Sequence, residues 1–160
     1  MSTLKPYIAL LAERTGLSLE TARDGSFTVL LEGRHLLIKE LSDAFLFYME
    51  VGRPTLIRRG EVMAALLGGN LFLAETRGAA LSYDELSEMA GLNLILPLHR
   101  LEGEEFINVV DNVVAAADEW ATRLKTFNAE AEERARQAGA ITEDAPEGFA
   151  PFDASVPLRI

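Results

Sequence analysis

The side chains that could do acid–base or metal chemistry are few in this chain. Only His35 and His99 carry an imidazole, and cysteine is absent. His35 falls in a predicted turn between two strands and His99 at the end of another, with no second histidine nearby to chelate a metal. We expect both to be surface residues. The lack of cysteine also excludes disulfides, thiolate metal sites and a cysteine nucleophile.

Two acidic clusters offer paired carboxylates, an arrangement that general acid–base catalysis can use. One follows a predicted strand and the other begins a predicted helix: Asp84, Glu85 and Glu88, then Glu102, Glu104 and Glu105. Acidic residues in the first turn of a helix are stabilised by the helix dipole. The structural interpretation is therefore much the stronger for the second cluster, and it is favoured for the first.

Glycine-rich and serine-containing segments add no catalytic candidate. Gly68-Gly69-Asn70 is not followed by Lys-Ser or Lys-Thr and ends a predicted helix, whereas a phosphate-binding loop begins one. No serine lies in a nucleophile-elbow context. The sequence predicts no catalytic residue, no metal site and no cofactor, so we expect a protein that is not an enzyme.

Composition and charge favour a single domain that binds other proteins. The chain has 160 residues, of which 49% are hydrophobic, enough for one core without staples. Its formal charge of −10 repels nucleic acid and anionic membranes and favours a basic or amphipathic peptide. A general bias toward acidic, soluble proteins explains the same charge equally well. The apolar run 7–12 is too short for a signal peptide, and no stretch approaches the ~20 apolar residues of a membrane span. We expect a cytoplasmic protein.

Hydrophobic periodicity predicts an α+β fold. Helical spacing marks residues 4–15, 61–71 and 103–137, with Gly16 and Gly139 ending the first and last helices. Strand patterns mark 27–32, 36–41, 44–51, 81–84 and 92–99. The order is α-β-β-β-α-β-β-α, a twisted antiparallel five-stranded sheet packed with helices. We divide the chain into a domain, 1–139, and an extended, proline-containing tail, 140–160.

The strands differ in how many of their faces are apolar. Leu92, Leu94, Leu96 and Leu98 alternate with other residues, which is typical of a half-buried strand. In the strand 44–51, by contrast, both faces are apolar. Both faces of that half of the sheet therefore need cover, which either the first helix or a partner must supply.

The order and spacing of several residues resemble the type III secretion effector chaperones typified by the Tir chaperone (CesT-like). These residues are Leu66-Leu67 with Asn70, Gly78-Ala79 before Leu81, the strand from Leu92 to Leu98, and Phe106 with Trp120. The resemblance covers residues 1–137 and implies the same element order. It implies a cytosolic homodimer that binds the N-terminal region of a secreted effector in extended form and keeps it soluble and secretion-competent.

The resemblance also assigns interface residues. It implies a dimer interface made by the second helix and the fourth strand, at Val62, Leu66, Leu67, Asn70, Leu81 and Tyr83. It implies an effector-peptide groove made by the first helix and neighbouring strands, at Leu4, Tyr7, Ile8, Leu11, Phe27, Val29, Phe45 and Phe47.

The C-terminal tail departs from the family pattern. It has prolines at 146, 151 and 157 and apolar residues at a spacing that suits anchors: Phe149, Phe152, Val156 and Ile160. We predict that residues 145–160 dock on an apolar groove of this or a neighbouring molecule and imitate the effector.

Two other classes of function stay open from the sequence. One is an acidic inhibitory or immunity-type protein that caps a folded partner through a few hot-spot residues. The other is a small-molecule-binding or catalytic α+β domain, which would need a pocket with convergent polar groups. The sequence offers no such groups, so this class ranks last.

Overall fold

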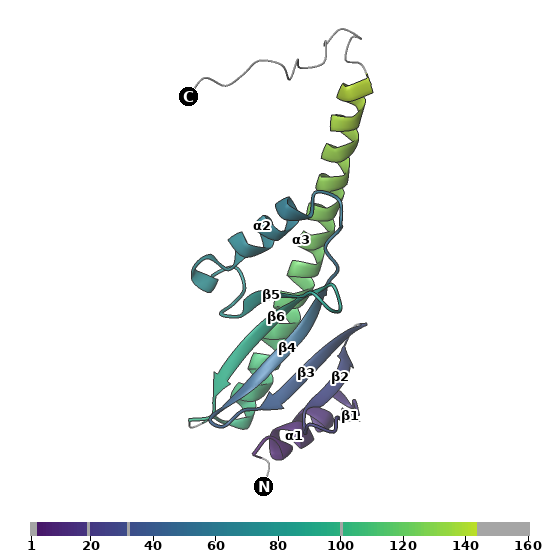
Figure 1. Ribbon diagram of the computed structural model, residues 1–160. Helices are drawn as coiled ribbons and strands as arrows, with labels where there is room; N and C mark the ends of the chain where they lie inside the picture. The colour runs from purple at the N-terminus through teal and green to yellow at the C-terminus, as the bar shows by residue number, and fades with distance from the viewer. Residues whose placement is uncertain (1–2, 19, 32, 100, 144–160) are drawn as a thin grey trace, which may run out of the picture.

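The computed structural model describes residues 3–18, 20–31, 33–99 and 101–143. In these residues three α-helices accompany one antiparallel sheet of six strands (Figure 1). The elements are α1 (Lys5–Thr15), β1 (Glu20–Thr21), β2 (Phe27–Leu31), β3 (Arg34–Glu40), β4 (Ala44–Gly52), α2 (Arg59–Gly69), the short 3-10 turn η1 (Leu71–Leu73), β5 (Ala80–Asp84), β6 (Met89–Pro97) and α3 (Gly103–Glu143). The predicted fold class is confirmed.

The sheet has the strand order β1-β2-β3-β4-β6-β5. The strand not expected from the sequence is β1, whose two residues pair with Phe27 and Thr28 of β2. Two residues are too few to show an alternating pattern, so only the pairing in the folded chain reveals this strand. The central strand β4 pairs with both β3 and β6 over most of its length.

The core lies between the sheet and the helices α1 and α3. Phe45, Phe47 and Met49 on β4 are fully buried, as are Leu36 and Ile38 on β3. The aromatic rings of Tyr7 on α1 and Phe106 on α3 have centroids 5.1 Å apart, and Tyr7 also meets Phe45 at 5.4 Å. Both helices therefore cover the same sheet face, so of the two covers that the sequence allowed for the other face, the first helix is excluded.

The N-terminal helix begins without a side-chain cap. Its N-cap residue is Leu4, which has no capping side chain. Instead the carboxylate of Glu40 on β3 accepts hydrogen bonds from the backbone N–H groups of Thr3 (2.9 Å) and Leu4 (3.4 Å). At the other end Gly16 has φ +68°, the left-handed conformation that glycine adopts without a Cβ clash, as predicted.

The last helix is longer than the sequence predicts. Gly139 does not end α3, which continues to Glu143 and extends past the sheet (Figure 1). An interior glycine costs only about 1 kcal/mol relative to alanine, which good helix formers on either side can offset. Side-chain pairs one turn apart support this stretch, including Arg134 with Glu130 and Gln137 with Glu133.

The helix α2 packs beside α3 at the β5 end of the sheet (Figure 1). The contact is close because Gly69 lies against the indole of Trp120, and a Cβ built on Gly69 would overlap that ring. Trp120 is almost fully buried there. Gly69, which belongs to the glycine pair tested above as a phosphate-binding loop, is therefore a packing residue.

Candidate functional site

The potential acid–base residues have structural roles in the folded chain. Asp84 accepts hydrogen bonds from the backbone of Leu86 and from the backbone and hydroxyl of Ser87. These bonds, the Ser87 hydroxyl first, lower the pKa of Asp84 and mark it as a turn residue. His35 lies 3.0 Å from the carboxylate of Glu50, and Glu104 pairs with Arg14. Within residues 3–143, where described, no group of three or more His, Asp or Glu side chains is placed to hold a metal.

The face of the sheet opposite the helices, which we call the outer sheet face, carries apolar side chains from four strands. Leu30 is 56% exposed and Ile95 is 60% exposed. Leu37, Leu46 and Tyr48 lie half-buried among them. The sequence predicted that both faces of this part of the sheet would need cover, and in the described residues no helix packs on the outer one.

Tyr48 gives the outer sheet face a polar group. Its ring lies over Gly91, where a Cβ would collide with the ring. Burial, with the negative charges of Glu50 and Asp84, raises the pKa of Tyr48 above its ordinary value of 10.0. A tyrosine hydroxyl is protonated at neutral pH even at its ordinary pKa, so this one can donate a hydrogen bond.

The β1–β2 end of the sheet offers backbone as well as side chains. Among the described residues, β1 pairs only with Phe27 and Thr28, while β2 continues to Leu31. A hollow of about 360 Å³ adjoins this edge, lined by Leu17, Ser18, Glu20, Thr28, Val29, Leu30 and His35. A shallower one of about 550 Å³ lies beside α1, lined by Lys5, Ile8, Ala9, Ala12, Gly16, Leu17 and Ser18.

Most of the residues predicted to line the effector-peptide groove lie in the hydrophobic core. Leu4, Ile8, Leu11, Phe27, Val29, Phe45 and Phe47 are buried in the core, and Tyr7 is half-buried with its hydroxyl donating to the Leu101 carbonyl (2.8 Å). Most of these side chains contact other parts of this chain, and of the set only Ile8 and Val29 also line the two hollows, so the groove assignment stays a prediction. The same hollows are also lined by Leu17, Leu30 and His35, which no periodic pattern of the sequence singles out.

The predicted dimer residues are brought together at the other end of the sheet. Leu66, Leu67, Leu81 and Tyr83, with Met63 and Ser82, line an apolar hollow of about 50 Å³. Leu67 is 66% exposed, whereas Val62 and Leu66 are buried. The binding of a second copy at this hollow stays a prediction.

Asn70 closes the edge of β5 at this place. Its side-chain oxygen accepts from the Leu81 backbone N–H (2.7 Å), and its side-chain amide donates to the Leu81 carbonyl (3.0 Å). Both outward-facing backbone groups of Leu81 are thus satisfied within the chain. An added strand cannot pair with β5 at this residue.

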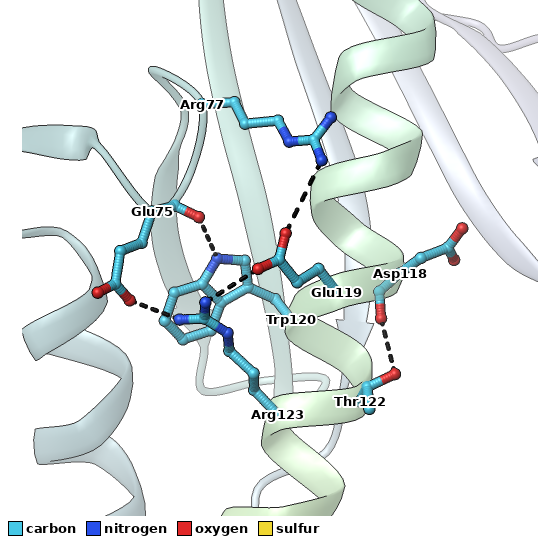
Figure 2. A network of polar contacts seen from close by, with 7 residues as sticks. All are labelled: Glu75, Arg77, Asp118, Glu119, Trp120, Thr122 and Arg123. Atoms are coloured by element: carbon cyan, nitrogen blue, oxygen red, sulfur yellow. Dashed lines mark hydrogen bonds and ion pairs between the residues drawn. The ribbon is translucent and has the colours of Figure 1, made fainter.

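A polar network joins the segment after α2 to α3, which Figure 2 shows in close view. The Trp120 indole N–H donates to the Glu75 carbonyl (3.0 Å), and Arg123 pairs with the carboxylates of Glu75 and Glu119. Arg77 reaches Glu119 at 3.9 Å. We call these five residues the clamp network; it fixes the position of the segment between α2 and β5.

Comparison with known families assigns the chain to a class. The Tir chaperone protein (CesT) family matches residues 7–121. The chain therefore belongs to this family, a class of chaperones rather than enzymes. No curated protein sequence matches the chain significantly.

Solved structures show the same fold. A chain in the ExsC–ExsE complex is similar with a TM-score of 0.67 and 21% identity, covering 78% of this chain and 97% of that chain. The Yersinia pestis type III secretion chaperone SycH, in complex with a fragment of YscM2, has a TM-score of 0.51 and 20% identity, covering 69% and 96%. The heterodimeric ExoU–SpcU complex from the Pseudomonas aeruginosa type III secretion system gives 0.54 and 20%, covering 75% and 95%.

No helix among the described residues is long and apolar enough to cross a membrane. The tail anchors Phe149, Phe152, Val156 and Ile160 lie outside the described residues, as does most of the segment 140–160. Their role, and the division of the chain at residue 139, stay predictions.

Proposed function

We propose that this protein is a type III secretion chaperone that binds the N-terminal region of an effector in extended form. It acts as a homodimer in the bacterial cytoplasm and keeps the effector soluble and competent for secretion, without turnover of a substrate. The family match supports the class, and similar chains of the same fold occur in chaperone–effector complexes.

The observation that carries the proposal is the combination of a largely unpaired sheet edge and an apolar outer face at the β1–β2 end. An extended peptide can add backbone hydrogen bonds to such an edge and place alternate side chains on the neighbouring surface. Leu30 is exposed where the hollow at the edge meets the outer sheet face. One extended segment can therefore contact both features.

Charge selects among such peptides. The chain carries a formal charge of −10, which attracts a basic or amphipathic segment and repels an acidic one. The attraction is long-ranged and weakens as salt screens it, so its main effect is on the rate of association.

The proposal is tested by co-expressing the chain with a candidate effector and measuring affinity by calorimetry. Leu30→Asp should weaken binding at least about tenfold, because it puts a charge into the contact while leaving an exposed position in the free protein. Leu56→Asp is the matched control, since Leu56 is also exposed but lies in the β4–α2 connection. Equal affinities of both variants would contradict this binding surface.

Limited proteolysis of the complex separates the two open classes of function. An effector held in extended form should be protected only as a short segment with no independent fold. Protection of a compact folded domain would instead support an inhibitory protein that caps its partner.

A further inference from the structure

We propose that the segment between α2 and β5 presents Phe72 to a second copy of this chain, and that the clamp network holds it in position to do so. The inference rests on the proposed homodimer and adds two things to it. It names an anchor residue that the sequence did not single out. It also assigns Trp120 a positioning role in the dimer, besides its place in the core.

Phe72 is exposed in a conformation that costs free energy. Its side chain is 90% exposed, and its φ is +57°. Leu73 and Arg77 in the same segment also have positive φ, +54° each. Left-handed backbone is unfavourable for residues other than glycine and persists only where the surrounding structure fixes it. At this exposure the ring buries little apolar surface against the described residues.

The surrounding structure does fix the segment. The backbone N–H of Gly78 donates to the Leu73 carbonyl (2.9 Å) and closes the loop. The buried hydroxyl of Thr76 lies within hydrogen-bond distance of the Leu73 and Ala79 carbonyl oxygens. The Trp120 indole N–H holds the Glu75 carbonyl from α3, as Figure 2 shows.

Arg123 completes the attachment by joining charge to ring packing. Its guanidinium lies 4.7 Å from the centre of the Trp120 ring while it pairs with Glu75 and Glu119. The segment is therefore tied to the longest helix by a backbone hydrogen bond, ion pairs and a cation–π contact. Such a segment presents Phe72 in a fixed place, so little entropy is lost when a partner binds it.

The surface beside Phe72 is apolar and contains a buried polar group without a partner in the described residues. Leu67 and Leu71, each 66% exposed, continue it from Phe72 to the hollow lined by Met63, Leu66, Leu81 and Tyr83. The Tyr83 hydroxyl is buried yet makes no hydrogen bond within the described residues. A buried hydroxyl without a partner is unfavourable, so a group from another molecule would stabilise it.

The occupant is a second copy rather than an extended effector. An extended peptide binds a sheet edge through its backbone, but Asn70 already satisfies both outward backbone groups of Leu81 on β5. A folded partner needs only side-chain packing. Two-fold symmetry would bring the Phe72 and Leu67 of each copy to the same surface of the other, a self-complementary contact.

The test is analytical ultracentrifugation of the full-length chain over a concentration series. Phe72→Ser should raise the dimer dissociation constant at least about thirtyfold, as expected for an interface anchor. Its circular dichroism spectrum should be unchanged because the ring is exposed. Leu30→Ser, which also removes an exposed apolar side chain but at the opposite end of the sheet, should leave the constant unchanged.

Trp120→Phe tests the positioning role, since it keeps a ring but removes the donor to Glu75. It should weaken the dimer in the native background and have no further effect in the Phe72→Ser background. A purely structural role for Trp120 predicts the same loss in both backgrounds, which would overturn the positioning assignment.

The other outcomes separate this inference from the proposed function. A native dimer that Phe72→Ser does not weaken would overturn the inference and leave the homodimer standing. A native chain that sediments as a monomer at micromolar concentration would overturn both. An intact Phe72→Ser dimer that has lost effector affinity would assign Phe72 to the effector instead.

Discussion

The two ends of the sheet differ in how their edges are finished. At the β1 end the edge strand has two residues, and hollows lined by both polar and apolar groups adjoin it. At the β5 end α2 packs beside the last strand, Asn70 satisfies the outward backbone groups of Leu81, and the hollow between them is lined mainly by apolar side chains. An edge with backbone groups to pair suits an extended peptide, whereas a capped edge with an apolar surface suits a folded partner. One sheet can thus serve two kinds of binding without interference.

The largest expected effect comes from disrupting the contact between α2 and α3 at the β5 end of the sheet. Gly69→Ala places a methyl group in the Trp120 ring, so we expect a loss of about 1–3 kcal/mol in the free energy of unfolding, measured by urea denaturation. Gly68→Ala is the matched control, because nothing lies within 4 Å of a Cβ there. It should be neutral or stabilising by up to about 1 kcal/mol. Equal stabilities of the two variants would show that α2 does not depend on this contact.

A smaller effect is expected from removing the C-terminal tail, and it tests which end of the sheet the tail occupies. Truncation after Glu143 removes residues 144–160 and with them the four predicted anchors. If the tail imitates the effector, effector affinity should rise roughly twofold to tenfold, since a competing occupant is lost. The free chaperone should also aggregate more readily, as light scattering would show.

The same truncation also tests whether the tail binds at the α2–β5 end of the sheet instead. A tighter dimer with unchanged effector affinity would place the tail at the α2–β5 end. Unchanged affinities and unchanged solubility would leave it without a docking role.

The smallest expected effect concerns the connection between β1 and β2. Hydrogen bonds from the Ser26 hydroxyl and from Lys39, with the Ser26 backbone N–H, hold the pKa of Asp24 well below its ordinary value of 3.8. Because the folded pKa is the lower one, Asp24 contributes stability above pH 3.8, and this contribution is lost as the pH falls through the folded pKa. Ser26→Ala should raise the pKa of Asp24 toward 3.8, measured by NMR titration. An unchanged titration would show that the Ser26 hydroxyl does not cause the shift, and would leave it to Lys39 and the Ser26 backbone N–H.

The elements of the fold are largely predictable because they depend on local patterns. The alternation of Leu92, Leu94 and Leu96 with Asn93 and Ile95 predicts β6, and in the structure Leu92 is buried while Ile95 is exposed. The helix boundaries at Gly16 and near residue 103 follow from equally local signals. Gly139 misleads because a single glycine weakens a helix without ending it, and the next strong signal, Pro146, comes seven residues later.

The candidate site is less predictable because exposure depends on which element covers which face. Periodicity groups Leu4, Ile8 and Leu11 on one face of α1, but it cannot say that this face meets Phe45 and Phe106 instead of solvent. For the outer sheet face, the sequence predicted only that its apolar residues need cover, without saying what covers them. The role of Asn70 has no sequence signal, since its partner is eleven residues away on a different element.

The sequence by itself determined the element order apart from β1, the apolar face of each strand and the family resemblance, because each depends on residues close together in the chain. The tertiary structure alone decided that α1 and α3 share one face, that Asn70 closes the β5 edge, and that Trp120 holds a strained segment with Phe72 exposed. The physical reason is that a buried face and a binding face are equally apolar. Only the arrangement of the whole chain shows which of the two has already found its partner.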